Sequence, residues 1–423
     1  MNKLKIAVEG CCHGELNKIY QSIPKSTDLL LICGDFQALR NQADFQALNV
    51  PKKYQKLGDF QDYYKGTKTA PVLTIFIGGN HESSSYLQEL KYGGWVAPNI
   101  YYLGEFGSVW YKGLLISGWS GIYNKYTFYN NNGIEMEKLP FDSSSIRSVY
   151  HQKLTNFIKM YLLGSKSDVI LSHDWPVGID KFGDKRTLLK RKPFFKDDIE
   201  KGELGSPLNE ILIHHLKPRY WFSGHLHVKF SANINHNEKQ HKKHQQLNNH
   251  EINLDLDFDE PEPKNETEVM TKRPKLDKNY ETSFLALDKV GNKRKFIELI
   301  EIETRLQHPS SKNSNLYYDR RSIAINKIVE TKLKKLKLDP QSVLKSLASL
   351  NQFLPIIEEE ISKLDKLNDD EFIVPENFEI IAPVEFDGKL KYFPNNQTKD
   401  YCEKFNIPRL NLESSDAPND DVS

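Results

Sequence analysis

The stretch Phe76-Ile77-Gly78-Gly79-Asn80-His81-Glu82 decides how this sequence is interpreted. It closes the apolar run Val72–Ile77, whose β-branched residues predict a buried strand. The two glycines favour a sharp turn, and an amide, an imidazole and a carboxylate follow it. In α/β proteins, ligands bind at the carboxyl ends of buried strands. The stretch therefore predicts a functional site at the edge of a sheet.

Other apolar runs also end in polar motifs. Strands are predicted at Lys5–Val8, Asp28–Cys33, Leu114–Trp119, Val169–Ser172 and Tyr220–Ser223. The motifs after four of them are Cys11-x-His13, Gly34-Asp35, His173 and Gly224-His225-x-His227. Helical periodicity appears between strands, for example over His151–Leu163. Strands that alternate with helices predict an α/β sandwich with its chemistry at the strand ends.

Composition excludes several classes of protein. The 423 residues allow two domains, and 58 Lys+Arg against 57 Asp+Glu exclude a globally basic nucleic-acid binder. Three of the four cysteines lie within or beside predicted strands, which disfavours a secreted disulfide framework. No signal-peptide core and no apolar stretch of about 18 residues is found. We therefore expect a reducing intracellular compartment and no membrane.

Changes in composition divide the chain. Residues 1–232 are expected to form a catalytic domain that contains an irregular loop at 120–151. A polar insertion rich in His, Lys, Asn, Asp and Glu follows at 233–281 and is expected to be disordered. Strands at 282–304 are expected to return to the sheet. A mainly helical domain at 305–412, with a helix that starts at Asp339-Pro340, and an acidic tail at 413–423 complete the chain.

The order of the motifs resembles the calcineurin-like metallophosphoesterases, in which Asp-x-His, Gly-Asp, Gly-Asn-His-Glu, a strand-end His and Gly-His-x-His follow one another. The resemblance implies a metallophosphoesterase β-sandwich flanked by helices, with two divalent metal ions. It assigns one metal to Cys11, His13, Asp35 and His227 and the other to Asp35, Asn80, His173 and His225. A hydroxide bridging the metals would attack phosphorus, and His81 would be the general acid that protonates the leaving oxygen.

Cys11 departs from the superfamily pattern, because most of these enzymes have Asp there. A cysteine within Glu-Gly-Cys-Cys-His-Gly-Glu-Leu resembles the RNA lariat debranching enzymes. Six other stretches carry the same resemblance: Gly34–Asn41, Ser120–Tyr123, Ile146–His151, Ser172–Pro176, Tyr317–Asp319 and Asn396–Cys402. It covers nearly the whole chain except the polar insertion. It implies hydrolysis of the 2′–5′ phosphodiester at the branch point of excised intron lariat RNA, giving linear RNA for turnover.

The cofactors and partners follow from the same resemblance. A thiolate ligand disfavours Mg²⁺ and suits Fe²⁺ or Zn²⁺, so we expect an iron–zinc centre with Mn²⁺ as a substitute. Branched RNA is the expected substrate and splicing-related proteins are expected partners, with no DNA. Lys272-Arg273-Pro274-Lys275 resembles a nuclear import signal, which favours the nucleus, with the cytoplasm as a second location.

The loop at 120–151 matches the family's lariat recognition loop. Its aromatic residues would stack on unpaired bases, with packing under the loop as the alternative. The RNA-contact residues that we expect here are Tyr126, Phe128, Tyr129, Arg147, Tyr150 and His151. The basic run 181–201 would contact phosphates, or else be a solvated face.

Two functions other than debranching are alternatives for this sequence. The first is another binuclear metallophosphoesterase that acts on nucleotides or phosphoproteins, which Cys11 and the 120–151 loop disfavour. The second is a non-catalytic scaffold, which is disfavoured because every ligand position and His81 are filled. Glu82 is expected to fix the glycine turn rather than bind metal, and Cys12, His214 and His215 are expected to be structural.

Overall fold

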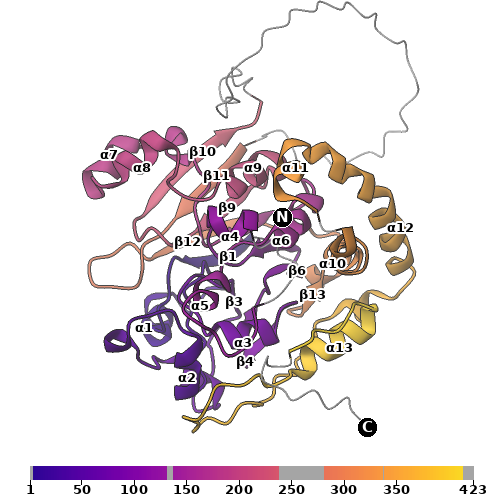
Figure 1. Cartoon of the computed structure of the whole chain (residues 1–423), viewed down its shortest axis with the longest axis horizontal. Helices are drawn as coiled ribbons and strands as arrows, with labels where there is room; N and C mark the ends of the chain where they lie inside the picture. Colours follow the sequence, from indigo (N-terminus) through magenta and orange to yellow (C-terminus); the bar gives the residue numbers. More distant parts are fainter. Residues whose placement is uncertain (1–2, 131–136, 238–280, 337, 413–423) are drawn as a thin grey trace, which may run out of the picture.

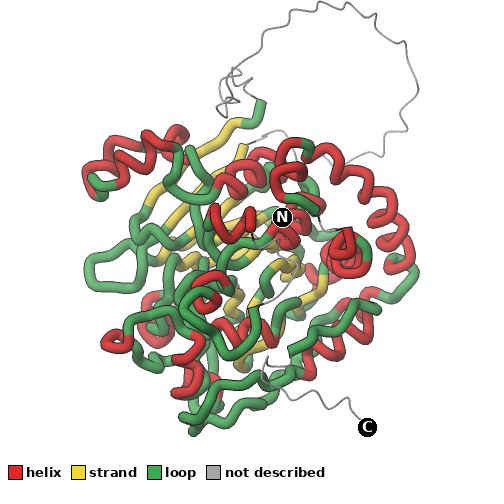
Figure 2. The backbone as a smooth tube through the Cα atoms, viewed as in Figure 1, coloured by secondary structure: helices red, strands yellow, loops and turns green. Residues whose placement is uncertain are grey.

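Two β-sheets packed face to face form the centre of the protein (Figure 1). The structure is a computed structural model that describes residues 3–130, 137–237, 281–336 and 338–412. The first sheet has six strands in the order β12-β1-β2-β3-β5-β4, and the second has seven in the order β10-β11-β9-β8-β7-β6-β13. Helices surround the strands (Figure 2). The α/β sandwich predicted from the sequence is confirmed.

The strands are short and several end where the polar motifs begin. The first sheet contains β1 (Lys3–Glu9), β2 (Leu29–Ile32), β3 (Thr74–Phe76), β4 (Gly94–Ala97), β5 (Ile100–Tyr102) and β12 (Ile297–Glu303). The second contains β6 (Phe106–Tyr111), β7 (Leu114–Trp119), β8 (Val169–Ser172), β9 (Tyr220–Ser223), β10 (Phe230–Asn235), β11 (Glu281–Ala286) and β13 (Leu316–Tyr318). Strands β1, β2, β3 and β5 run parallel, as do β7, β8, β9 and β11. Parallel strands place their carboxyl ends at a common edge.

The space between the sheets is filled by apolar side chains from both. Ile6 and Val8 of β1 belong to the same buried cluster as Ile116 of β7 and Leu171 of β8. Every residue of β2 and β8 is buried, because helices cover the outer faces of both sheets. This explains why these strands read as continuous apolar runs in the sequence.

Helices cover the two outer faces. The first sheet is covered by α1 (Leu16–Ser22), α2 (Phe60–Tyr64) and α3 (Ser84–Glu89), and the second by α6 (Leu154–Leu162) and α9 (Pro207–Leu216). Helix α9 begins after Ser206, because the Ser206 side chain accepts a hydrogen bond from the Asn209 N–H. Two more helices, α7 (Lys185–Arg191) and α8 (Phe195–Lys201), hold the basic run 181–201.

The C-terminal region shares its core with the second sheet. Its helices are α10 (Arg320–Thr331), α11 (Pro340–Lys345), α12 (Leu354–Leu364) and α13 (Asn396–Phe405). Their apolar side chains belong to one cluster with those of α6 and α9, and β13 pairs with β6. The buried Lys159 of α6 also contacts Glu330 of α10 at 2.8 Å. The C-terminal region therefore completes the sandwich rather than forming a separate body.

The structure corrects three expectations. The loop at 120–151 contains two short helices, α4 (Lys125–Asn130) and α5 (Ser145–Ser148), while 131–136 lie outside the described residues. The insertion expected to begin at residue 233 starts later, because strand β10 continues past that residue and buries alternate side chains against the sheet. Residues 238–280 lie outside the described residues. The helix predicted from Pro340 through Leu350 breaks at Ser346, whose backbone is not helical, and a 3₁₀ helix, Leu347–Phe353, follows. The acidic tail is also outside the described residues.

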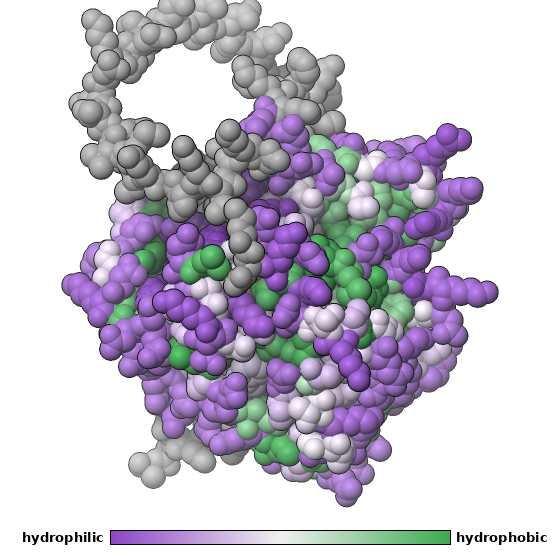
Figure 3. Space-filling model, turned by 180° about the vertical axis from the view of Figure 1, so that it is seen from behind, coloured by the Kyte–Doolittle hydropathy of each residue, from purple (hydrophilic) through white to green (hydrophobic). Residues whose placement is uncertain are grey.

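The surface is mainly hydrophilic on the face turned away in Figure 1, with separate hydrophobic areas (Figure 3). Large apolar side chains are exposed singly among the described residues, for example Tyr126 on α4 at 77% exposure. None of the helices in the described part of the chain is long and apolar enough to cross a bilayer.

Candidate metal centre

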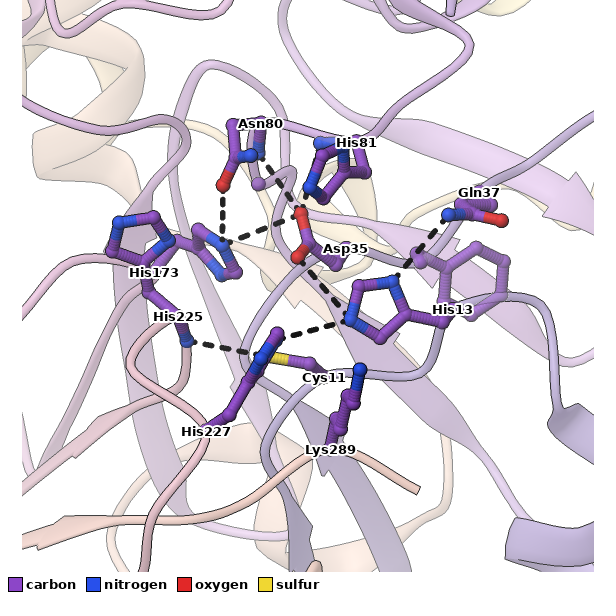
Figure 4. Close-up of polar contacts among 12 residues, drawn as sticks. Cys11, His13, Asp35, Gln37, Asn80, His81, His173, His225, His227 and Lys289 are labelled. Carbon is purple, nitrogen blue, oxygen red and sulfur yellow. Dashed lines mark hydrogen bonds and ion pairs between the residues drawn. The ribbon is translucent and has the colours of Figure 1, made fainter. Parts of the chain in front are cut away.

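The candidate metal ligands follow five parallel strands that come from both sheets. Cys11 and His13 follow β1, Asp35 follows β2, Asn80 follows β3, His173 follows β8, and His225 and His227 follow β9. The carboxyl ends of these strands meet at one edge of the sandwich, and the side chains point toward one another there (Figure 4). The structure thus brings together all the residues that the sequence nominated as ligands.

Four donors surround one point. The ligand atoms of Cys11, His13, Asp35 and His227 all lie within 4.8 Å of one another. The Nε2 atoms of His13 and His227 are 3.2 Å apart, and His13 Nε2 is 3.6 Å from Asp35 Oδ2. A thiol sulfur, two imidazole nitrogens and a carboxylate oxygen form a donor set that suits a transition metal.

A second group of donors lies on the other side of Asp35. His173 Nε2 is 3.3 Å from Asp35 Oδ1 and 3.2 Å from Asn80 Oδ1, and the ring of His225 lies 5.0 Å from the ring of His173. His173 Nδ1 donates to the carbonyl oxygen of Cys33 at 2.7 Å, so the Nε2 lone pair faces the group. Each oxygen of Asp35 therefore faces one group, an arrangement that would let one carboxylate serve both groups.

The protonation states fit divalent cations. Burial lowers the pKa of His13 to about 4 and that of His227 to about 3, so both imidazoles are neutral at pH 7. Burial opposes the ionisation of Asp35, but His173 and His13 hold its pKa well below the usual range. Burial and the nearby Asp35 raise the pKa of Cys11, so a cation is needed to stabilise its thiolate. The protonation states of the first group thus fit a divalent metal. In the second group burial lowers the pKa of His173, but Asp35 raises it above its ordinary value, so a cation there would displace a proton.

The backbone of this site adopts an uncommon conformation. His13, Asp35, His225 and His227 have φ values of 47°, 48°, 63° and 50°, in the left-handed region. Hydrogen bonds stabilise this conformation at Asp35, whose Oδ1 accepts from the N–H groups of Asn80 and His81 at 3.0 and 2.9 Å. Strained residues of this kind cluster at functional sites.

Comparison with known proteins gives the family. Residues 4–229 match the calcineurin-like phosphoesterase family, and 279–410 match the family described as lariat debranching enzyme, C-terminal domain. The chain is 40% identical over 425 residues to the lariat debranching enzyme of Homo sapiens. These aligned residues cover 97% of this chain and 70% of the human protein. The chain belongs to the lariat debranching enzyme family.

Two other relatives agree. The lariat debranching enzyme of Saccharomyces cerevisiae is 42% identical over 328 residues, 74% of this chain and 81% of the yeast protein. Lariat debranching enzyme A of Xenopus laevis is 39% identical over 426 residues, 97% of this chain and 71% of the frog protein. As a member of this family, the chain is a metallophosphoesterase hydrolase that uses divalent metal ions.

Glu82 fixes the turn that carries the debranching family's Gly-Asn-His-Glu motif. Its buried carboxylate accepts hydrogen bonds from the N–H groups of Phe36, Gln37 and Gly79, each at 2.8 Å. Gly79 is required because a Cβ there would lie 2.3 Å from Asp35 Oδ1. Glu82 thus joins the loop after β2 to the loop after β3, in agreement with the role expected from the sequence.

His81, the expected general acid, lies at the rim of the site. Its ring is 5.8 Å from that of His13, and its Nδ1 is 3.3 Å from the carbonyl oxygen of Asn49. The Asn49 side chain also donates to the Tyr150 hydroxyl at 2.6 Å, which links His81 to the recognition loop. Asn49 was not found from the sequence, because it lies in a segment with no periodicity.

The residues expected to contact RNA differ in how far they are exposed. Tyr126 and Arg147 are exposed, Tyr129 is partly buried, and Tyr150 and His151 line a pocket with Gly79. Phe128 departs from the expectation, because it is only 1% exposed and packs against Phe157 and Tyr129. Its ring is part of the core, so the alternative of packing under the loop holds for Phe128.

Proposed function

We propose that this chain hydrolyses the 2′–5′ phosphodiester at the branch point of lariat RNA with two metal ions and His81 as the general acid. Debranching of lariat RNA is the activity of the family to which it belongs. The position of Asp35 supports the two-metal mechanism, because its Oδ2 faces His13 and its Oδ1 faces His173. A single carboxylate placed in this way supports a binuclear centre.

The donors divide between two metal sites. Cys11, His13, Asp35 and His227 would hold one ion, and Asp35, Asn80, His173 and His225 would hold the other. When bound, the ions would supply Lewis acidity to the phosphate and lower the pKa of a water molecule. The thiol of Cys11 favours Fe²⁺ and Zn²⁺ as the occupants, with Mn²⁺ as a substitute.

His81 would transfer a proton to the leaving 2′ oxygen. The contact between its Nδ1 and the Asn49 carbonyl orients the ring and leaves Nε2 for the substrate. Cleavage would then leave a 2′ hydroxyl on the branch nucleotide and a 5′ phosphate on the other strand. No bond to the protein forms in this reaction.

The recognition loop would hold the bases around the branch. Tyr126 offers an exposed ring for stacking, and Arg147 offers an exposed guanidinium for a phosphate. Tyr150 and His151 would line the approach to His81. Splicing-related partners and a nuclear location stay predictions, since Lys272-Arg273-Pro274-Lys275 lies outside the described residues.

A branched RNA with one 2′–5′ and one 3′–5′ linkage tests the proposal. The full chain would be loaded anaerobically with Fe²⁺ and Zn²⁺ and compared with a His81→Ala variant. Cleavage confined to the 2′–5′ bond and lost in the variant is expected. Hydrolysis of a simple phosphodiester without cleavage of the branched RNA would instead favour a broader phosphoesterase.

A further inference from the structure

Lys289 lies beside the metal centre, on the connection between β11 and β12. Its backbone forms an isolated parallel bridge with Cys11, and the N–H of Val290 donates to the Cys11 carbonyl oxygen at 3.3 Å. The nitrogen end of the Lys289 side chain points toward the imidazole of His13 (Figure 4). The position of Lys289 is therefore tied to that of a metal ligand, although no sequence motif marks it.

The charge of Lys289 has no acidic partner within the part of the chain that the structure describes. Its side chain is partly buried, and its nitrogen end faces the imidazole of His13 (Figure 4). No ion pair of Lys289 is found among the described residues, whereas the neighbouring Asp288 is paired with Arg294 at 2.5 Å. A partly desolvated ammonium without a counter-ion can bind an anion without first breaking an ion pair.

A second cation reaches the same edge from a distant segment. Lys192 caps the carboxyl end of α7. Burial lowers its pKa, Asp288 opposes this shift, and the positive charges of Arg294 and Lys289 add to it. Helix α7 and the β11–β12 connection lie on the same side of the molecule (Figure 1). The basic run 181–201 thus lies on the side of the molecule that carries the β11–β12 connection, with Lys289 on that connection (Figure 1).

We propose that Lys289 binds a phosphodiester oxygen of the branched substrate, with Lys192 adding positive charge on its outer side. This inference rests on the proposed function, because a branch nucleotide carries phosphates on its adjacent 2′ and 3′ oxygens. The ammonium donates charge-assisted hydrogen bonds to an anionic oxygen, and no metal is required for that contact. The oxygen belongs either to the phosphate that is cleaved or to the 3′ phosphate beside it.

A Lys289→Met variant tests the proposal, because Met keeps an unbranched side chain only one atom shorter and removes the charge. Lys295→Met, an exposed lysine on the same connection, is the matched control. Each full-length protein would be assayed with branched RNA and with a 2′–5′ linked dinucleotide that lacks the 3′ phosphate. Metal content would be measured on the same samples.

The expected result is a fall in kcat/KM of about 10–100-fold for Lys289→Met on branched RNA, the range of one charge-assisted hydrogen bond, with unchanged metal content. An equal fall on the dinucleotide assigns the contact to the cleaved phosphate, and a fall on branched RNA alone assigns it to the 3′ phosphate. Lys289→Arg should restore most of the activity.

Rates equal to the control on both substrates would overturn the proposal, and so would loss of metal from Lys289→Met. If the unmodified protein leaves branched RNA intact but hydrolyses bis(p-nitrophenyl) phosphate, the proposed function fails by itself. Lys289 is then tested by the binding of branched RNA, where weaker binding by Lys289→Met than by Lys295→Met supports phosphate binding and equal binding contradicts it.

Discussion

The backbone N–H of His225 donates a hydrogen bond to the sulfur of Cys11 at 3.0 Å. This contact joins the first candidate ligand in the chain to the Gly-His-x-His motif more than two hundred residues later. Gly224 makes it possible, because a Cβ there would lie 2.9 Å from the same sulfur. A backbone N–H that points at a sulfur stabilises its thiolate form. This contact offsets part of the effect of burial and of Asp35, which together raise the pKa of Cys11.

Replacing Cys11 with Asp should change the metal preference. A carboxylate is a hard ligand, so the affinity for Zn²⁺ and Fe²⁺ should fall by about tenfold or more, while activity with Mn²⁺ should be retained. Elemental mass spectrometry and activity titrations with each metal would measure this. Cys12→Ala is the matched control, because Cys12 is buried in the core beside α1. Unaltered metal preference in Cys11→Asp would show that the sulfur is not a ligand.

Removing His81 should affect the leaving group rather than the metals. His81→Ala should lower kcat on branched RNA by about 10²–10⁴-fold, the usual contribution of a general acid. Bis(p-nitrophenyl) phosphate has a leaving group that needs no proton, so its hydrolysis should change much less. Equal losses on both substrates, with full metal content, would argue that His81 positions the phosphate instead.

Glu82→Gln should loosen both loops that carry the metal ligands. The amide offers only one acceptor oxygen to three backbone N–H groups, so at least one buried donor loses its partner. We expect about 1–3 kcal/mol less stability and roughly 10–100-fold weaker metal binding. Denaturation and metal titration would measure these effects, with the exposed Glu200→Gln as the control. Wild-type metal affinity in Glu82→Gln would contradict the positioning role.

Two aromatic residues of the recognition loop should behave in opposite ways. Tyr126→Ala should weaken RNA binding by about 1–3 kcal/mol, the contribution of one stacked base, without affecting stability. Phe128→Ala should instead destabilise the fold by about 3–5 kcal/mol, because its ring is buried. Fluorescence binding assays and thermal denaturation separate the two effects. A Tyr126→Ala variant that binds branched RNA normally would remove Tyr126 from the contact surface.

His308 should make stability depend on pH. It stacks on Trp110 with ring centroids 4.0 Å apart, and burial lowers its pKa from 6.5 to about 4. Between pH 6.5 and pH 4 the unfolded chain binds a proton that the folded chain does not, so stability falls as the pH falls. Because the ring is partly exposed, we expect a contribution of about 1–2 kcal/mol.

A His308→Asn variant isolates this contribution. Asn retains an acceptor for the Ser310 N–H but cannot be protonated in this range. The other histidines titrate equally in both proteins, so the variant should lose less stability than the wild type between pH 7.5 and pH 5. Identical losses in urea denaturation would show that His308 does not contribute.

Local sequence patterns were enough to predict the strands and the candidate metal ligands. Buried runs such as Val169–Ser172 and Tyr220–Ser223 predicted strands that the structure confirms with the same bounds. The polar motifs after these runs nominated the residues that now meet at one edge of the sandwich. These inferences succeed because strand formation and turn geometry depend on residues that are close in the chain.

Relationships across the sandwich were decided only by the tertiary structure. The sequence does not show that the oxygens of Asp35 face two different groups, that Phe128 is buried, or that Lys289 is bridged to Cys11. Each depends on the order of strands within the sheets and on how the sheets pack. Residues far apart in the chain become neighbours only when the whole core is assembled, because the energy that places them comes from burial and not from local pattern.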